Sequence, residues 1–217
     1  MIRPIAFTVA VCIPAALFGN QGFIDQSFED YGGYASVGNE WRQAQTFTVG
    51  SPGRIFRVDA ALRPGDTDDL SSDATVELSL VRTINGLPSL EPNNVLATAV
   101  ATFPAPDLEY LDGLLPGSRH AFQWVEFDFE PLPIAAGELL AIVLHSSEPH
   151  GYQWATNFQV DYSGGQGLWG PPAFDEHTGD PRDYLFRTHV IPEPQAFVSG
   201  VICLLCCIGL RHRIFVD

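Results

Sequence analysis

Four aromatic residues in the second half of the chain are the side chains best placed to bind a ligand. They are Tyr152, Trp154, Tyr162 and Trp169. Glycine-rich stretches surround them, and the flat rings of tyrosine and tryptophan bury the CH-rich faces of sugars well. An exposed set of this kind would form a carbohydrate-binding surface. The alternative is that these rings fill the core or fix the loops, as we expect for Trp41 and Trp124.

A cluster of aspartates offers a second kind of chemistry. In the segment GDTDDLSSD, the carboxylates belong to Asp66, Asp68, Asp69 and Asp73. Calcium prefers several hard oxygen ligands on a flexible loop, so this segment could hold a calcium ion. The glycine and glutamate of an EF-hand loop are missing, and a solvated acidic hairpin loop has the same composition. The sequence indicates no other cofactor.

Two further groups of polar residues could do chemistry. His145, Glu148 and His150 combine imidazole and carboxylate, which are metal ligands, although a polar loop after a strand would contain the same residues. Glu126 and Asp128 alternate along one expected strand, so their side chains would lie about 6–7 Å apart on one face. Such a pair could serve a glycosidase. The simpler interpretation is the solvent side of a half-buried strand.

Motifs of the common enzyme classes are missing from the sequence. There is no G-x-S-x-G, no H-E-x-x-H and no P-loop. The four cysteines occupy the apolar ends of the chain, at Cys12, Cys203, Cys206 and Cys207. The domain between those ends would therefore fold without disulfides. We expect a protein that is not an enzyme.

The charge of the chain limits its partners. The formal net charge is −15, and all eleven basic residues are arginines. Such a surface repels nucleic acid and anionic membranes, which excludes nucleic acid as a partner. An acidic surface is compatible with calcium binding, with cationic partners, or with a role in solubility alone.

The pattern of apolar residues predicts strands. Apolar and polar residues alternate with period two over residues 54–62, 75–83 and 124–129, while 139–144 is continuously apolar, as in a central strand. Turn signals such as Asn85-Gly86 separate these segments, and the chain contains 20 glycines and 17 prolines. We predict an all-β fold, a single jelly-roll-like β-sandwich.

The N-terminal residues predict export. Residues 1–19 contain one arginine, Arg3, followed by an uncharged apolar run over residues 5–18. That run is short for a transmembrane helix and suits a signal-peptide helix, with cleavage near Gly19. A buried N-terminal helix or strand is the alternative. The sandwich would then occupy residues 20–190.

The C-terminal residues 191–217 predict a second signal. Pro192, Glu193 and Pro194 form a rigid, extended element. An uncharged run at 196–210 follows, then Arg211 and Arg213. The run would span about 22 Å as a helix, and snorkelling arginines or a thinned bilayer could complete a transmembrane span. The arginines would stay in the cytoplasm and the domain outside.

This order of features resembles the PEP-CTERM sorting tag of Gram-negative bacteria. The resemblance implies that Pro192, Glu193 and Pro194 are recognised by an exosortase, a membrane protease, and that Arg211 and Arg213 stop transfer across the inner membrane. Proteins with this tag are associated with exopolysaccharide, biofilm matrix and the cell surface. A permanent single-span anchor is the alternative, and it gives the same location.

The central region resembles the β-sandwich of choice-of-anchor domains. The matching segments are Gln45-Thr46-Phe47, Asn85-Gly86-Leu87-Pro88, Leu132–Leu144, Tyr152-Gln153-Trp154, Tyr162-Ser163-Gly164-Gly165 and Leu185-Phe186-Arg187. They cover most of residues 40–190. Because that family has no settled activity, the resemblance implies a fold rather than a function.

Together these features predict an exported surface or matrix protein, a binding or structural module that contacts the membrane transiently. Polysaccharide is the candidate ligand. The alternatives are a secreted carbohydrate-active enzyme, which needs a cleft near Glu126 or Asp128, and a membrane-tethered structural spacer. Exposure of Trp154 and Trp169 would separate a binding module from a spacer.

Overall fold

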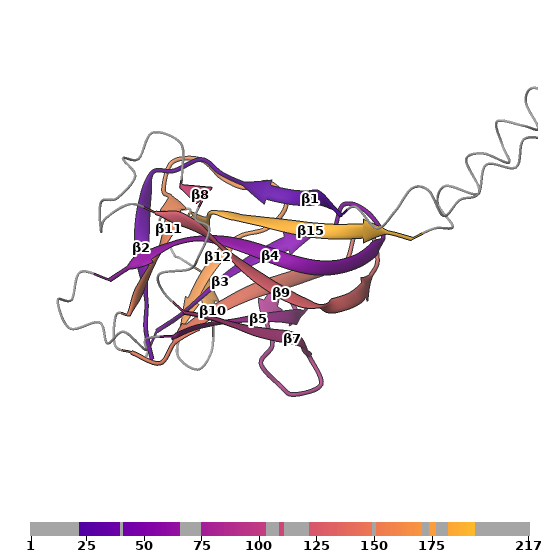
Figure 1. The fold of residues 1–217 in the computed structure, drawn as a ribbon, viewed down its shortest axis with the longest axis horizontal. Coiled ribbons are helices and arrows are strands. Elements are labelled where there is room, and N and C mark those ends of the chain that lie inside the picture. Colours follow the sequence, from indigo (N-terminus) through magenta and orange to yellow (C-terminus); the bar gives the residue numbers. More distant parts are fainter. Residues whose placement is uncertain are drawn as a thin grey trace, which may run out of the picture. The chain divides into compact units, whose positions relative to one another are not determined.

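Strands make up the fold between the two chain ends. The computed structural model describes residues 22–39, 41–65, 75–102, 109–110, 122–148, 151–170, 174–176 and 182–193. Gly22–Glu193 forms one compact unit, and its described residues contain strands and no helix (Figure 1). The all-β prediction is confirmed. The predicted signal helix 1–19, the predicted helix 196–210, Pro194, Arg211 and Arg213 lie outside the described residues.

Two sheets build this unit. In the first, β4 pairs with β9, β15 and β11, β15 pairs with β1, β11 pairs with β2 and β14, and β9 pairs with β8. Its strands are β1 (Phe23–Phe28), β2 (Gly33–Val37), β4 (Gly53–Pro64), β8 (Glu109–Tyr110), β9 (Gln123–Ile134), β11 (Tyr152–Asn157), β14 (Asp183–Tyr184) and β15 (Phe186–Pro192).

The second sheet runs in the order β13, β12, β3, β10, β5, with β6 and β7 both pairing with β5. Its strands are β3 (Arg42–Thr48), β5 (Thr75–Ile84), β6 (Leu87–Pro88), β7 (Val95–Thr102), β10 (Leu139–Ser146), β12 (Gly167–Gly170) and β13 (Asp175–Glu176). The pairings recorded in both sheets are antiparallel.

A single large core lies between the two sheets. Phe47 and Leu80 of the second sheet belong to the same buried cluster as Val58, Trp154 and Phe186 of the first. Burial of this apolar surface is the main driving force for the sandwich. The core therefore explains why strand sides alternate between apolar and polar residues.

Strand β10 confirms the prediction of a central strand at 139–144. It pairs with β3 on one side and β5 on the other. Leu140 and Ile142 point into the main core, whereas Ala141 and Val143 belong to a smaller apolar cluster on the opposite face. Both faces of β10 are thus covered, and this is why its sequence is continuously apolar rather than alternating.

The turn that the sequence predicts at Asn85-Gly86 is present in the structure. These two residues join β5 to β6 and have φ values of 55° and 83°. A two-residue hairpin turn with positive φ at both positions matches the right-handed twist of the strands, and asparagine and glycine tolerate it best. Local turn chemistry therefore fixes this hairpin.

No helix in the described part of the chain is both long enough and apolar enough to cross a membrane.

Candidate functional site

Two of the four aromatic residues predicted to bind sugar are core residues. Tyr152 and Trp154 lie in β11 and have no exposed surface. The Trp154 indole stacks on Tyr184 with ring centroids 4.4 Å apart, and its Nε1–H donates to the Leu185 carbonyl oxygen at 2.8 Å. A ring without exposed surface cannot stack on a sugar, so the prediction is wrong for these two residues.

Tyr162 is half-buried and fixes a loop. Its hydroxyl donates to Gln26 Oε1 at 2.8 Å, and its ring packs edge-on against Phe186. Burial, together with the charges of Asp25 and Asp183, raises the pKa of Tyr162 to about 12. This residue therefore joins the loop between β11 and β12 to β1 and β15.

Trp169 forms part of a surface pair with Trp41. The two indoles stack with centroids 5.1 Å apart and an interplanar angle of 26°. Trp169 lies in β12, opposite Gln43 of β3. Trp41 is the last residue of a turn that begins at Gly38, and the Gly38 N–H donates to the Trp41 carbonyl oxygen at 3.1 Å. Trp41 is 37% exposed, so the expectation of a core position is wrong. By contrast, Trp124 is 5% exposed, which confirms its expected core position.

The Trp41–Trp169 pair lies at one end of the sandwich. The N–H groups of Asn39 and Gly151 both donate to the Glu148 carbonyl oxygen, and the Gly65 N–H donates to the Gly151 carbonyl oxygen. These bonds place the Trp41 turn beside the end of β4, where Pro64 pairs with Tyr152.

The chain leaves the domain at the other end. There Gly53, the first residue of β4, pairs with Pro192, the last residue of β15 (Figure 1). Strand β4 has 12 residues, and the steps between its first and last residue, at about 3.3 Å each, span roughly 36 Å. The exposed tryptophan and the exit at Glu193 are therefore separated by about the length of β4.

Buried polar residues of β3 adjoin the tryptophan pair, since Gln43 lies opposite Trp169. Gln43 Nε2 donates to the Ser36 carbonyl oxygen at 2.8 Å, and Gln43 Oε1 accepts a hydrogen bond from the Tyr184 hydroxyl. Gln45 Nε2 donates to Asp183 Oδ1 at 2.9 Å, while its Oε1 accepts from the Tyr184 N–H at 2.7 Å. The two glutamines thus tie β3 of one sheet to β2 and β14 of the other.

Burial also alters the acidity of this network. It raises the pKa of Asp183 above its ordinary value, although hydrogen bonds from the Tyr162 and Gly167 N–H groups and from Gln45 oppose the shift. Burial likewise raises the pKa of Tyr184. Hydrogen-bonded polar groups in a low-dielectric interior favour a single arrangement, and Gln43 of this network lies opposite Trp169 in the pairing of β3 with β12.

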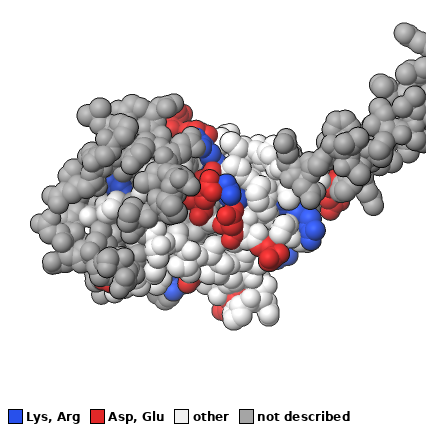
Figure 2. All heavy atoms as spheres, in the orientation of Figure 1, with Lys and Arg blue, Asp and Glu red and all other residues white. Residues whose placement is uncertain are grey.

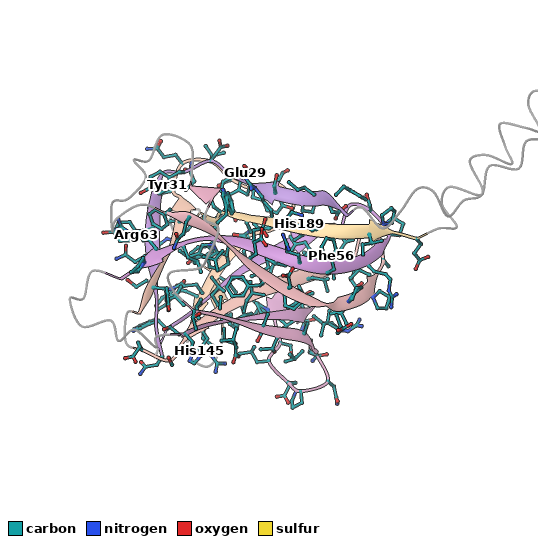
Figure 3. The ribbon with its side chains drawn as sticks, viewed as in Figure 1. Glu29, Tyr31, Phe56, Arg63, His145 and His189 are labelled. Carbon is teal, nitrogen blue, oxygen red and sulfur yellow. The ribbon has the colours of Figure 1, made fainter. Side chains whose placement is uncertain are left out.

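A second aromatic group, which the sequence analysis missed, surrounds the start of β2. Tyr31 and Tyr34 are 44% and 43% exposed, and their rings lie 5.4 and 6.4 Å from the ring of buried Phe122. The Arg63 guanidinium carbon lies 4.4 Å from the centre of the Tyr34 ring and 4.9 Å from that of Phe122. Figure 3 shows Tyr31 and Arg63 at the same end of the ribbon. The sequence feature that could have indicated this group is the pair of tyrosines that flank Gly32-Gly33.

The carboxylates considered for glycosidase chemistry are ion-paired with one arginine. Arg57 Nη1 lies 2.7 Å from Glu126 Oε2, and Arg57 Nε lies 2.7 Å from Asp128 Oδ1. The two acidic side chains are 56% and 64% exposed. Figure 2 shows arginine and acidic side chains intermingled on the visible face. This arrangement matches the solvated face of a strand.

The candidate metal ligands lie mostly outside the described residues. Asp66, Asp68, Asp69, Asp73 and His150 belong to the part of the chain that the structure does not describe. His145 lies in β10 opposite Glu77 of β5. Among the described side chains, no group of three or more His, Cys, Asp or Glu residues is arranged to hold a metal ion. The calcium site therefore stays a prediction.

Comparison with known proteins gives no family for this chain. No family model matches the sequence, and no curated protein matches it. Among solved structures, one match is the crystal structure of the cysteine protease and lectin-like domains of Cwp84, a surface layer associated protein of Clostridium difficile. The TM-score is 0.43 and the sequence identity 12%, over 71% of this chain and 33% of that one. This chain spans about a third of that chain's length, and at this TM-score the likeness carries no argument about function.

Proposed function

We propose that this chain is an exported, non-enzymatic β-sandwich module that binds polysaccharide at the cell surface or in the extracellular matrix of a Gram-negative bacterium. The observation that carries the proposal is the Trp41–Trp169 stack, which holds a partly exposed indole at one end of the sandwich. The transport and final location of the protein are inferred from its terminal sequences. An exosortase would recognise Pro192, Glu193 and Pro194 while the protein stays transiently in the inner membrane.

An indole held in place is a suitable surface for a sugar ring. Trp169 covers one face of Trp41, so Trp41 keeps its orientation in the free protein. A preorganised side chain loses little conformational entropy when it binds, and its exposed apolar surface is buried by the CH-rich face of the ligand. Binding at such a surface needs no catalytic group.

The position of the stack supports a role at the surface. The chain continues beyond Glu193 into the predicted membrane segment, whereas the Trp41 end of the domain is about one length of β4 away. Within the domain, a site at that end is therefore remote from the residue at which the tail begins.

No observation favours the enzyme alternative. Glu126 and Asp128 both pair with Arg57 on the solvent-facing side of β9, where their side chains are 56% and 64% exposed. A glycosidase needs one of its two carboxyl groups as a proton donor with a raised pKa. Of the two tryptophans whose exposure separates a binding module from a structural spacer, Trp154 is fully buried and Trp169 is partly exposed, so the spacer alternative is decided by the binding measurement that follows.

Affinity electrophoresis tests the binding site directly. We expect the full-length chain, purified in detergent, to be retarded in gels containing a neutral polysaccharide from a panel of xylan, galactomannan, hydroxyethylcellulose, amylose and dextran. Trp41→Ala should weaken that binding by about tenfold or more, equivalent to about 1.4 kcal/mol. The matched control is Phe23→Ala, because Phe23 is 40% exposed but lies at the Val190 end of β1. Retardation that Trp41→Ala leaves unchanged, or none with any of these polymers, would contradict the proposed function.

The sorting step has its own test. We expect the full chain, expressed in a Gram-negative host with an exosortase, to appear at the surface or in the medium with both terminal segments removed. Intact-mass spectrometry of each cell fraction measures this. A product that keeps residues 195–217 in the membrane fraction would make the tail a permanent anchor. Full-length protein in the cytoplasm would contradict export altogether.

A further inference from the structure

We infer that the polysaccharide site extends along β2 from Trp41 to Tyr31 and Tyr34, so that its ligand is the interior of a neutral glycan chain rather than a terminal sugar. This inference rests on the proposed function and deepens it. Tyr31 precedes β2 by two residues and Tyr34 is its second residue, whereas Trp41 follows the end of β2 by four residues and directly precedes β3; all three side chains are partly exposed.

The tyrosine end of the surface is as firmly built as the tryptophan end. Tyr31 and Tyr34 both pack against Phe122, which is 1% exposed. The buried Arg63 guanidinium lies against Tyr34, and Arg63 Nε donates to Gln153 Oε1 at 2.5 Å. A guanidinium over a tyrosine ring is attracted by the ring's electrons and fixes its orientation.

The backbone that carries Tyr31 is fixed as well. The Gly32 N–H donates to the Thr156 carbonyl oxygen at 2.9 Å, and Asn157 Nδ2 donates to the Asp30 carbonyl oxygen at 3.0 Å. A Cβ atom at Gly33 would lie 2.1 Å from the Phe158 ring, so the loop packs closely against its neighbours. Both tyrosines are therefore presented without large ordering costs on binding.

The separation of the two ends sets the size of the ligand. Tyr34 is three residues from Val37, about 10 Å along β2. The turn from Gly38 to Trp41 follows at once. A single sugar ring, about as large as a tyrosine ring, cannot cover both ends, whereas a chain of several rings can. Linked contacts of this kind raise affinity far more for a polymer than for a short fragment.

Charge favours a neutral glycan. The chain carries a net charge of −15 and no lysine, so a polyanion is repelled. The one cation in the tyrosine group, Arg63, is 9% exposed and already contacts two rings and a glutamine. Exposed tyrosines supply stacking surface and hydroxyl groups, which match the alternating CH and OH groups of a neutral sugar.

The experiment uses size-fractionated oligosaccharides, prepared by partial acid hydrolysis of whichever neutral polysaccharide retards the wild-type chain. Titration calorimetry compares wild type, Tyr31→Ala/Tyr34→Ala, Trp41→Ala and the control Phe23→Ala, all as full-length chains in detergent. For the wild type we expect affinity to rise with oligosaccharide length. The double tyrosine variant should lose about tenfold in affinity for the longest fraction and keep the affinity of the wild type for the disaccharide. Circular dichroism confirms that each variant is folded.

The outcomes separate this inference from the proposed function. Loss of binding in Trp41→Ala with no effect of the tyrosine substitutions overturns the extended site alone. Absence of binding by the wild type to every neutral polysaccharide overturns both proposals. Binding of a soluble proline-rich peptide that depends on Tyr31 and Tyr34, while glycan binding is unchanged, would assign the tyrosines to a protein partner and overturn the inference. Conservative Tyr31→Phe/Tyr34→Phe should retain most of the affinity if stacking is the dominant contact.

Discussion

Trp154→Ala is expected to lower the free energy of unfolding by about 3–5 kcal/mol, the range for large aromatic residues removed from a core. Trp154 is fully buried, stacks on Tyr184 and donates its indole N–H to the Leu185 carbonyl oxygen. The substitution removes the ring, leaves a cavity between the sheets and leaves a buried carbonyl with one partner fewer. Urea denaturation followed by tryptophan fluorescence and far-UV circular dichroism measures the effect.

Two matched variants make this result specific. Trp154→Phe keeps an aromatic ring but not the N–H donor, so its destabilisation should be smaller, about 1–3 kcal/mol. Trp41→Ala removes the same type of side chain from the surface and should change stability by less than about 1 kcal/mol. If Trp154→Ala and Trp41→Ala were equally stable, the assignment of Trp154 to the core and of Trp41 to the surface would be wrong.

Asp183→Ala is expected to destabilise the fold by a similar amount, about 3–5 kcal/mol, because several donors lose a common acceptor. Asp183 Oδ1 accepts from Gln45 Nε2 at 2.9 Å, and Oδ2 accepts from the Tyr162 N–H at 2.7 Å. The Gly167 N–H also donates to this carboxylate. Without it, β3, β14 and the loop before β12 lose their shared connection. Chemical denaturation at neutral pH provides the measurement.

The pH dependence of the same residue has a definite sign. Burial raises the pKa of Asp183 above 3.8, so the folded state binds this proton more tightly than the unfolded state. The pH-dependent part of the stability that this carboxyl contributes is therefore fully present below pH 3.8 and is lost as the pH rises through the folded pKa, whereas its hydrogen bonds to Gln45 and Tyr162 still contribute at neutral pH. Asp183→Asn has no such titration. The unfolding free energy of the wild type minus that of Asp183→Asn should fall with rising pH across this interval, and a rise would mean that the folded state favours the anion.

Much of the fold was predictable from local sequence. The alternation in 54–62 and 75–83 identified the centres of β4 and β5, and the run at 139–144 identified β10 as central. Asn85-Gly86 located a hairpin from turn chemistry alone. These signals succeed because they depend on short-range geometry and on burial of one or both faces, which the residue pattern records directly.

The candidate site was harder to predict because it depends on contacts between distant segments. Tyr152 and Trp154 lie among glycines, yet all six residues of β11 are buried because β2, β4 and β14 cover the strand within a two-layer core. Trp41 was expected in the core, whereas its stacking partner Trp169 is 128 positions later in the chain and holds it at the surface. The sequence gives no indication that Gln43 and Gln45 of β3 are buried, because their hydrogen-bond partners Asp183 and Tyr184 follow about 140 residues later.

The placement of β15 has a mechanical consequence. This last strand lies between β1 and β4 and is hydrogen-bonded to both, with Phe186 opposite Phe28 and Ala60, and Val190 opposite Phe23 and Ile55. In antiparallel pairs these bonds run perpendicular to the strands. A pull on Glu193 along the strand axis therefore loads both ladders in shear, so many bonds resist together instead of breaking one by one. A domain held at its C-terminal end while its far end binds a polymer would carry tension through β15 and the two strands paired with it.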